Sequence, residues 1–143
     1  MLITIFGESC TGKSTLADKI HQAIGGEIIT GNDYLRFAKN KDEARKVFAA
    51  KLNDALTGNA LIYVVTEKDL LSHVPQGSIR ILVSADLDTI KERFKERMHG
   101  NLPVPVAAML EKKHGLFDDE PFDIHVENGI PSVSEILAMI KNT

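Results

Sequence analysis

Short apolar runs recur along the chain, and most are followed by a stretch in which apolar residues take helical spacing. The first run, residues 2–6 (LITIF), is too short for a typical core helix and predicts a buried strand. In the next segment, residues 14–24, the side chains of Leu16, Ile20 and Ile24 fall on one face of a helix. Four further runs predict strands, at residues 27–30, 60–66, 79–85 and 122–126.

Helical spacing fills the segments that join these strands. Residues 34–57 are rich in Ala, Lys, Leu and Phe and predict helix, which a break near Asn40 would divide. Further helices are expected over residues 86–99 and 106–114, and Ser132 caps a last one. Strands that alternate with helices form βαβ units, so the pattern predicts a parallel sheet with helices on both faces.

The composition bounds the function classes. A chain of 143 residues, 43% hydrophobic and 26% charged, suits a single domain over residues 1–143. The net charge of −3 offers no broad basic surface and disfavours a nucleic-acid partner. No basic segment precedes the first apolar run and Glu8 ends it, so we expect neither a signal peptide nor a membrane span. The single cysteine, Cys10, excludes an internal disulfide and suits the reducing cytoplasm, where we expect the protein.

A phosphate-binding motif lies between the first predicted strand and the first predicted helix. The sequence there matches the pattern G-x-x-x-x-G-K-[ST], and the strand–loop–helix context is the one that the motif requires. A glycine-rich turn that matches by chance is the alternative, which this context disfavours. The residues expected to bind the nucleotide in this loop are Gly7, Glu8, Ser9, Cys10, Thr11, Gly12, Lys13, Ser14 and Thr15.

Each invariant position of the motif has a physical task. Gly7 and Gly12 allow the backbone to turn sharply and approach phosphate oxygens without a Cβ. The loop amides and the free N–H groups of the following helix then attract an anion. Lys13 can reach the β- and γ-phosphates as a catalytic residue, and the hydroxyl of Ser14 can ligate Mg²⁺. The motif therefore predicts ATP and Mg²⁺ as cofactors.

With this motif and this element order, the chain resembles the small P-loop kinases of the nucleotide-kinase group, which includes adenylate, cytidylate, shikimate and adenylylsulfate kinases. The resemblance covers most of the chain, although its specific motif is the phosphate loop alone. It implies a three-layer αβα fold, a five-stranded parallel sheet in the order 2-3-1-4-5, and a short arginine-bearing lid at about residues 93–105. It also implies transfer of the γ-phosphoryl group of ATP to a hydroxyl or phosphate of a nucleotide, nucleoside or related small metabolite.

The turn after the second predicted strand reads GNDYLR, in which Asp33 and Arg36 are spaced D-x-x-R. This spacing resembles that found in adenylylsulfate kinases and in the kinase domain of polynucleotide kinases. In those families the Asp lies near the acceptor hydroxyl and the Arg holds an acceptor phosphate. The resemblance implies that Asp33 is catalytic and that both residues bind the acceptor. The alternative is an N-cap Asp followed by a solvated Arg.

Two arginines lie four residues apart on the helix after the fourth predicted strand. Arg93 and Arg97 therefore share a face, and the mobile-looking loop HGNLPVP follows them. This segment is similar to the lid of nucleotide kinases, whose arginines stabilise the charge of the transferring phosphoryl group, so the resemblance implies that both are catalytic. A salt-bridged helix surface is the alternative, because Glu92, Lys95 and Glu96 are interleaved with them.

Two further candidates follow strands. Glu67 ends the third predicted strand, where P-loop proteins often hold Mg²⁺ through a carboxylate; here it is expected at the acceptor side, and a surface Glu is the alternative. Asn128 follows the last predicted strand, in the loop whose backbone holds the adenine edge in similar kinases, although an Asn-Gly turn explains it equally.

Three other functions compete with that of a small-molecule kinase. A GTPase is rejected because the sequence at residues 40–43 departs from the guanine motif N-K-x-D at its last position. A nucleotide-binding regulatory module without transfer activity needs neither the Asp33–Arg36 pair nor the arginines of the helix. A polynucleotide-end kinase is disfavoured by the acidic charge and the lack of a basic aromatic stripe. We expect a monomer or homodimer that acts on a small-molecule acceptor, without a membrane partner.

Overall fold

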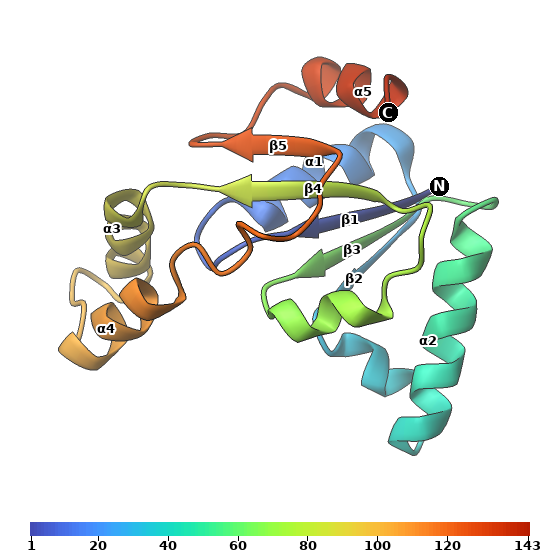
Figure 1. Cartoon of the computed structure of the whole chain (residues 1–143), viewed down its shortest axis with the longest axis horizontal. Coiled ribbons are helices and arrows are strands. Elements are labelled where there is room, and N and C mark those ends of the chain that lie inside the picture. The colour runs from blue at the N-terminus through green and yellow to red at the C-terminus, as the bar shows by residue number, and fades with distance from the viewer.

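Five parallel strands form the centre of the computed structural model, which describes residues 1–143 (Figure 1). They lie in the order β2-β3-β1-β4-β5, which confirms the predicted fold class and strand order. The strands are β1 (Leu2–Phe6), β2 (Glu27–Thr30), β3 (Leu61–Val65), β4 (Ile79–Ser84) and β5 (Ile124–Glu127).

The two central strands are apolar because both of their faces are covered. Every residue of β1 and β3 is buried, and the register pairs Ile3 with Ile62 on one side and with Ile79 on the other. The one polar side chain in β1 is Thr4, whose hydroxyl shares a 2.8 Å hydrogen bond with the hydroxyl of Ser78. This bond satisfies both buried hydroxyls, so the centre of the sheet tolerates them.

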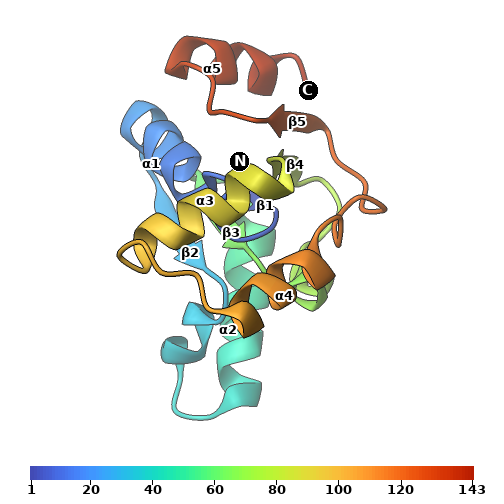
Figure 2. The same ribbon diagram turned by 90° about the vertical axis from the view of Figure 1, so that its left-hand side faces the viewer.

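Helices cover both faces of the sheet. One core packs α1 and α5 against one face, around residues such as Ile5, Leu16 and Ile136. The other core packs α2 and two 3₁₀ turns, Asp33–Phe37 and Lys68–His73, against the opposite face. Two more helices, α3 and α4, lie beyond the carboxyl ends of the strands and cross in front of the sheet in Figure 2. The helices are α1 (Lys13–Ile24), α2 (Lys41–Ala55), α3 (Leu87–Arg97), α4 (Val104–Lys113) and α5 (Val133–Lys141).

Several predicted boundaries shift in the structure. The helix expected over residues 34–57 is divided near Asn40, whose Oδ1 accepts a 2.8 Å hydrogen bond from the N–H of Glu43 and so starts α2. The last strand begins at Ile124 rather than at residue 122. The helix expected from residue 106 begins two residues earlier, because a proline fits the first turn of a helix.

None of the helices has the length and apolarity needed to cross a membrane.

The aromatic cluster under α2 generates a stability prediction. Phe48 is 1% exposed and stacks on Tyr34 with ring centroids 4.5 Å apart, while its neighbour Val47 is 36% exposed. We expect Phe48→Ala to lower the free energy of unfolding by about 3–5 kcal/mol through the cavity it leaves. Val47→Ala is the matched control on the same helix and should change the free energy of unfolding by about 0.5 kcal/mol or less. Urea unfolding of both variants measures this, and equal losses would contradict the packing described.

Candidate active site

The phosphate loop leaves β1 at a point where two other strands crowd its backbone. The N–H of Gly7 donates a 3.2 Å hydrogen bond to the carbonyl of Val65 at the end of β3. A Cβ on Gly7 would lie 2.1 Å from the carbonyl oxygen of Val83 in β4, so only glycine fits there. At the other end of the loop, Gly12 has a φ of 102°, and a Cβ there would lie 2.8 Å from Ile130. Close approach to the backbone therefore explains Gly7, and the left-handed backbone conformation explains Gly12.

Lys13 is folded back over the loop that it follows. It is the first residue of α1, is only 6% exposed, and its ammonium donates to the carbonyl of Glu8. Burial lowers the pKa of the Lys13 ammonium from 10.5 to about 8; the guanidinium of Arg97 reinforces this shift, and negative charge on Cys10 and Glu8 opposes it. Burial disfavours the charged form of this ammonium, and a nearby anion would stabilise it. Phosphate oxygens could provide that negative charge.

A small cavity of about 140 Å³ opens at the loop. It is lined from four directions: by the loop and the start of α1, by the end of β2, by the end of β3, and by α3. This agrees with the rule that sites of parallel sheets lie at the carboxyl ends of the strands. Its lining residues are Ser9, Cys10, Gly12, Lys13, Ser14, Thr15, Thr30, Val64, Thr66 and Arg97.

The two arginines of α3 face the phosphate loop. Arg93 donates a 3.0 Å hydrogen bond from Nη1 to the carbonyl of Cys10, and Arg97 lines the small cavity. Neither arginine takes part in an ion pair. The alternative of a salt-bridged helix surface is therefore wrong for these two residues. A second cavity, of about 490 Å³, adjoins the first and is lined by Cys10, Gly12, Thr15, Arg93, Glu96, Arg97 and Ile130.

Asn128 has a structural task next to this second cavity. Its φ is 52°, its Oδ1 accepts a 2.9 Å hydrogen bond from the N–H of Asp86, and its own N–H donates to the carbonyl of Ser84 at 2.9 Å. Asn128 thus ties the end of β5 to the end of β4, and contact with a base stays a prediction. Ile130, two residues on, is the residue of this loop that reaches the cavity, and nothing in its local sequence pattern singles it out.

A third cavity, of about 510 Å³, lies on the other side of the phosphate loop, between the end of β3 and α4. It contains Glu67, together with Ser9 and Thr66, which also line the small cavity. The sequence provides no motif for the α4 side of this cavity. Its lining residues are Glu8, Ser9, Thr66, Glu67, Lys68, Asp69, Met109, Leu110, Lys113, Leu116 and Phe117.

Glu8 and Thr11 hold the phosphate loop in place. The hydroxyl of Thr11, which is buried, donates a 2.9 Å hydrogen bond to the carbonyl of Glu8. The carboxylate of Glu8 lies 3.0 Å from Nδ1 of His114 and accepts a 3.2 Å bond from the N–H of Gly115. The loop is therefore connected directly to the segment that follows α4.

Asp33 and Arg36 lie apart from these three cavities. They pair with each other at 3.7 Å, with side chains 56% and 79% exposed, and neither lines a cavity next to the phosphate loop. Thr30, at the end of β2, is the residue from this edge of the sheet that lines the small cavity. The acceptor roles of Asp33 and Arg36 stay predictions.

The protein side chains near the loop suit a metal that arrives with its nucleotide. No group of three or more His, Cys, Asp or Glu side chains is arranged to hold a metal ion. Ser14 is exposed and lines the small cavity beside Lys13. A hydroxyl in that position fits a Mg²⁺ ion whose other ligands are phosphate oxygens and water.

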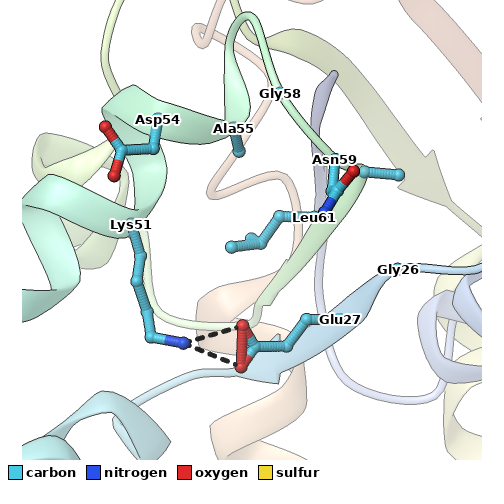
Figure 3. A pocket seen from close by; sticks show the side chains of 9 residues that line it. Gly26, Glu27, Lys51, Asp54, Ala55, Gly58, Asn59 and Leu61 are labelled. Atoms are coloured by element: carbon cyan, nitrogen blue, oxygen red, sulfur yellow. Dashed lines mark hydrogen bonds and ion pairs between the residues drawn. The ribbon is translucent and has the colours of Figure 1, made fainter.

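A fourth cavity, of about 400 Å³, opens at the opposite edge of the sheet, where β2 and β3 begin (Figure 3). The ammonium of Lys51 reaches across it to the carboxylate of Glu27, at 2.9 and 3.2 Å. Both side chains are more than a third exposed, so this pair contributes little to stability. Since it lies at the amino ends of the strands, this cavity is not part of the candidate site.

The chain is similar to known proteins in its fold and not in its sequence. No protein-family model matches the sequence, and no curated protein matches it significantly. A shikimate kinase from Acinetobacter baumannii is similar in structure, with a TM-score of 0.66, 16% identity, and 99% of this chain and 93% of that chain covered. A Janibacter sugar kinase gives a TM-score of 0.65 at 17% identity, with coverage of 98% and 94%.

A gluconokinase from Sinorhizobium meliloti is also similar, with a TM-score of 0.56, 18% identity, and coverage of 96% of this chain and 87% of that chain. At this level of identity the likeness concerns the fold. The strand order, the phosphate loop between β1 and α1, and these three structures agree. The chain therefore has the fold of the small P-loop kinases.

Proposed function

We propose that the protein is a kinase that uses ATP and Mg²⁺ to phosphorylate a small acceptor molecule. The observation that carries this proposal is the surroundings of the phosphate loop: buried Lys13 and Arg97 line one cavity, and Arg93 donates a hydrogen bond to the loop carbonyl of Cys10. A protein that only binds nucleotide needs the loop but has no evident use for the two arginines. The three similar structures are a sugar kinase, a gluconokinase and a shikimate kinase, which supports the same function.

The chain offers distinct residues for each part of a bound nucleotide. The loop amides, Lys13 and the N-terminus of α1 would bind the β- and γ-phosphates, and the hydroxyl of Ser14 would hold Mg²⁺, which would help to neutralise their charge. The 490 Å³ cavity beside Ile130 has room for the nucleoside part. Arg93 and Arg97 stabilise the charge that develops on the transferring phosphoryl group.

Residues 93–105 form the proposed lid. They include the end of α3 and the connection to α4, where His99 and Gly100 both have positive φ and end the helix. Arg97 already lines the cavity at the phosphate loop, and closure of this connection over that cavity would exclude water from the transferring group. For the acceptor, the candidates are the Asp33–Arg36 pair beyond β2 and Glu67 after β3.

Transfer itself is tested with γ-labelled ATP, Mg²⁺ and pooled hydroxyl acceptors. We expect labelled product from the wild type. Arg93→Ala and Arg97→Ala should lower the turnover rate by at least about tenfold while the Kd for ATP changes much less, because these arginines act on charge of the transition state. Lys95→Ala on the same helix is the matched control. Nucleotide that binds tightly but is never transferred would instead identify a regulatory module.

The lowered pKa of Lys13 generates a prediction about proton linkage. At about pH 9 most free protein carries a neutral Lys13, because burial lowers its pKa to about 8. Bound phosphates stabilise the ammonium and raise its pKa, so ATP binding should take up close to one proton at about pH 9, and the affinity should fall as the pH rises above about 8. Calorimetry in two buffers of different ionisation enthalpy measures the uptake.

Lys13→Met, which keeps the apolar part of the side chain, is the control for this experiment. Residual ATP binding by this variant should take up no proton at about pH 9. Uptake of the same size in this variant would assign the proton to another group.

A further inference from the structure

The 510 Å³ cavity between α4 and the end of β3 lies beside the phosphate loop and has the size of a ligand site. Its volume is within the range of about 300–1,000 Å³ that is usual for small-molecule sites. Because Ser9 and Thr66 line both this cavity and the small cavity at the loop, the two spaces adjoin. A molecule in the larger cavity would therefore meet the terminal phosphate of a nucleotide held by Lys13.

One wall of this cavity is apolar. Phe117 is 2% exposed and is fixed against Phe6, with ring centroids 5.6 Å apart. Met109 and Leu116 leave 40% and 38% of their surface exposed beside it. Partly exposed apolar side chains that line a cavity can cover the apolar face of a ring or carbon chain in a ligand.

The other wall carries charged side chains, and some of them already have partners within the protein. Lys68 pairs with Glu120 at 3.8 Å, and Glu8 is held by His114 at 3.0 Å. The side chains of Glu67, Asp69 and Lys113 take part in no ion pair.

Two carboxylates and one ammonium therefore remain free to meet a ligand. Carboxylates accept hydrogen bonds from hydroxyl groups but repel a phosphate, and here they outnumber the single lysine. This balance favours a neutral acceptor that carries several hydroxyl groups.

We propose that this cavity is the acceptor site, that the acceptor is an uncharged polyhydroxyl molecule with an apolar face, and that Glu67 is the base for its phosphorylation. The inference deepens the proposed kinase function and rests on it. It narrows the acceptor from the broad set of nucleotides, nucleosides and related metabolites to those without a phosphate of their own.

In the proposed step, an acceptor hydroxyl oxygen attacks the γ-phosphorus of ATP. A new oxygen–phosphorus bond forms while the bond from the γ-phosphorus to the bridging oxygen breaks, and ADP leaves with that electron pair. The hydroxyl proton passes to the carboxylate of Glu67 and is later lost to water. Arg97, which lines the small cavity, stabilises the charge of the transferring group.

The position of Glu67 distinguishes it from Asp33. Glu67 follows β3, which pairs directly with β1, the strand that leads into the phosphate loop. Asp33 follows β2, one strand farther out, and its carboxylate is paired with Arg36 at the surface. A base must lie within hydrogen-bond reach of the proton it takes, and of the two carboxylates only Glu67 lines a cavity next to the loop.

The acceptor class is tested with matched pairs of probes: D-ribose and D-ribose 5-phosphate, D-glucose and D-glucose 6-phosphate, adenosine and AMP. With γ-labelled ATP, we expect transfer to at least one neutral member, at least about tenfold faster than to its phosphorylated partner. Faster transfer to the phosphorylated partners would overturn the proposal. So would the absence of transfer to every neutral member by a preparation that binds ATP.

The role of Glu67 is tested with the neutral acceptor that the wild type uses best. Glu67→Gln should lower transfer by about a hundredfold or more while the Kd for ATP stays within about threefold of the wild type. Glu27→Gln, at the opposite edge of the sheet, is the matched control and should transfer normally (Figure 3). Asp33→Asn should retain more transfer than Glu67→Gln.

This experiment distinguishes a wrong assignment of Glu67 from a protein that is not a kinase. Full transfer by Glu67→Gln, or loss of transfer confined to Asp33→Asn, would overturn the role of Glu67 and leave the kinase function standing. Failure of the wild type to bind ATP in calorimetry would overturn both. Melting temperatures of the variants show that a loss of transfer is not a loss of folding.

Discussion

The contact on which the rest of the site depends is the close approach of Gly7 to the backbones of β3 and β4. Its N–H bonds to Val65, and its missing Cβ leaves room for the carbonyl of Val83. This contact fixes where the chain leaves β1 and therefore where α1 begins. Lys13 is then buried at the start of that helix, and the lowering of its pKa follows from its position.

The parallel sheet gathers the remaining groups around this loop. Because all five strands point the same way, the ends of β2 and β3 and the start of α3 meet at one edge (Figures 1 and 2). The loop separates two larger cavities, one beside the arginines of α3 and one beside α4. A nucleotide on one side and an acceptor on the other would meet at Lys13, which is the arrangement that phosphoryl transfer requires.

The features that could be predicted from the sequence are those with a local physical signal. The strand order followed from the resemblance that the phosphate loop and the element order support, and the loop itself has fixed spacing. Arg93 and Arg97 were found because helical spacing puts them on one face. The α4 wall of the 510 Å³ cavity was missed, since Met109 and Phe117 look like ordinary core residues in the sequence and only tertiary packing brings them to Glu67. The surface pairing of Asp33 with Arg36 also depends on how the turn after β2 folds.

If the loop around Lys13 binds nucleotide phosphates, the replacement of Lys13 must weaken nucleotide binding. A calorimetric titration of wild type and Lys13→Ala with ATP and Mg²⁺ at neutral pH measures this. The account predicts saturable binding of one nucleotide to the wild type and a Kd at least about tenfold weaker in the variant, at an unchanged melting temperature. Equal affinity in the two proteins, or no binding to the wild type, would contradict it.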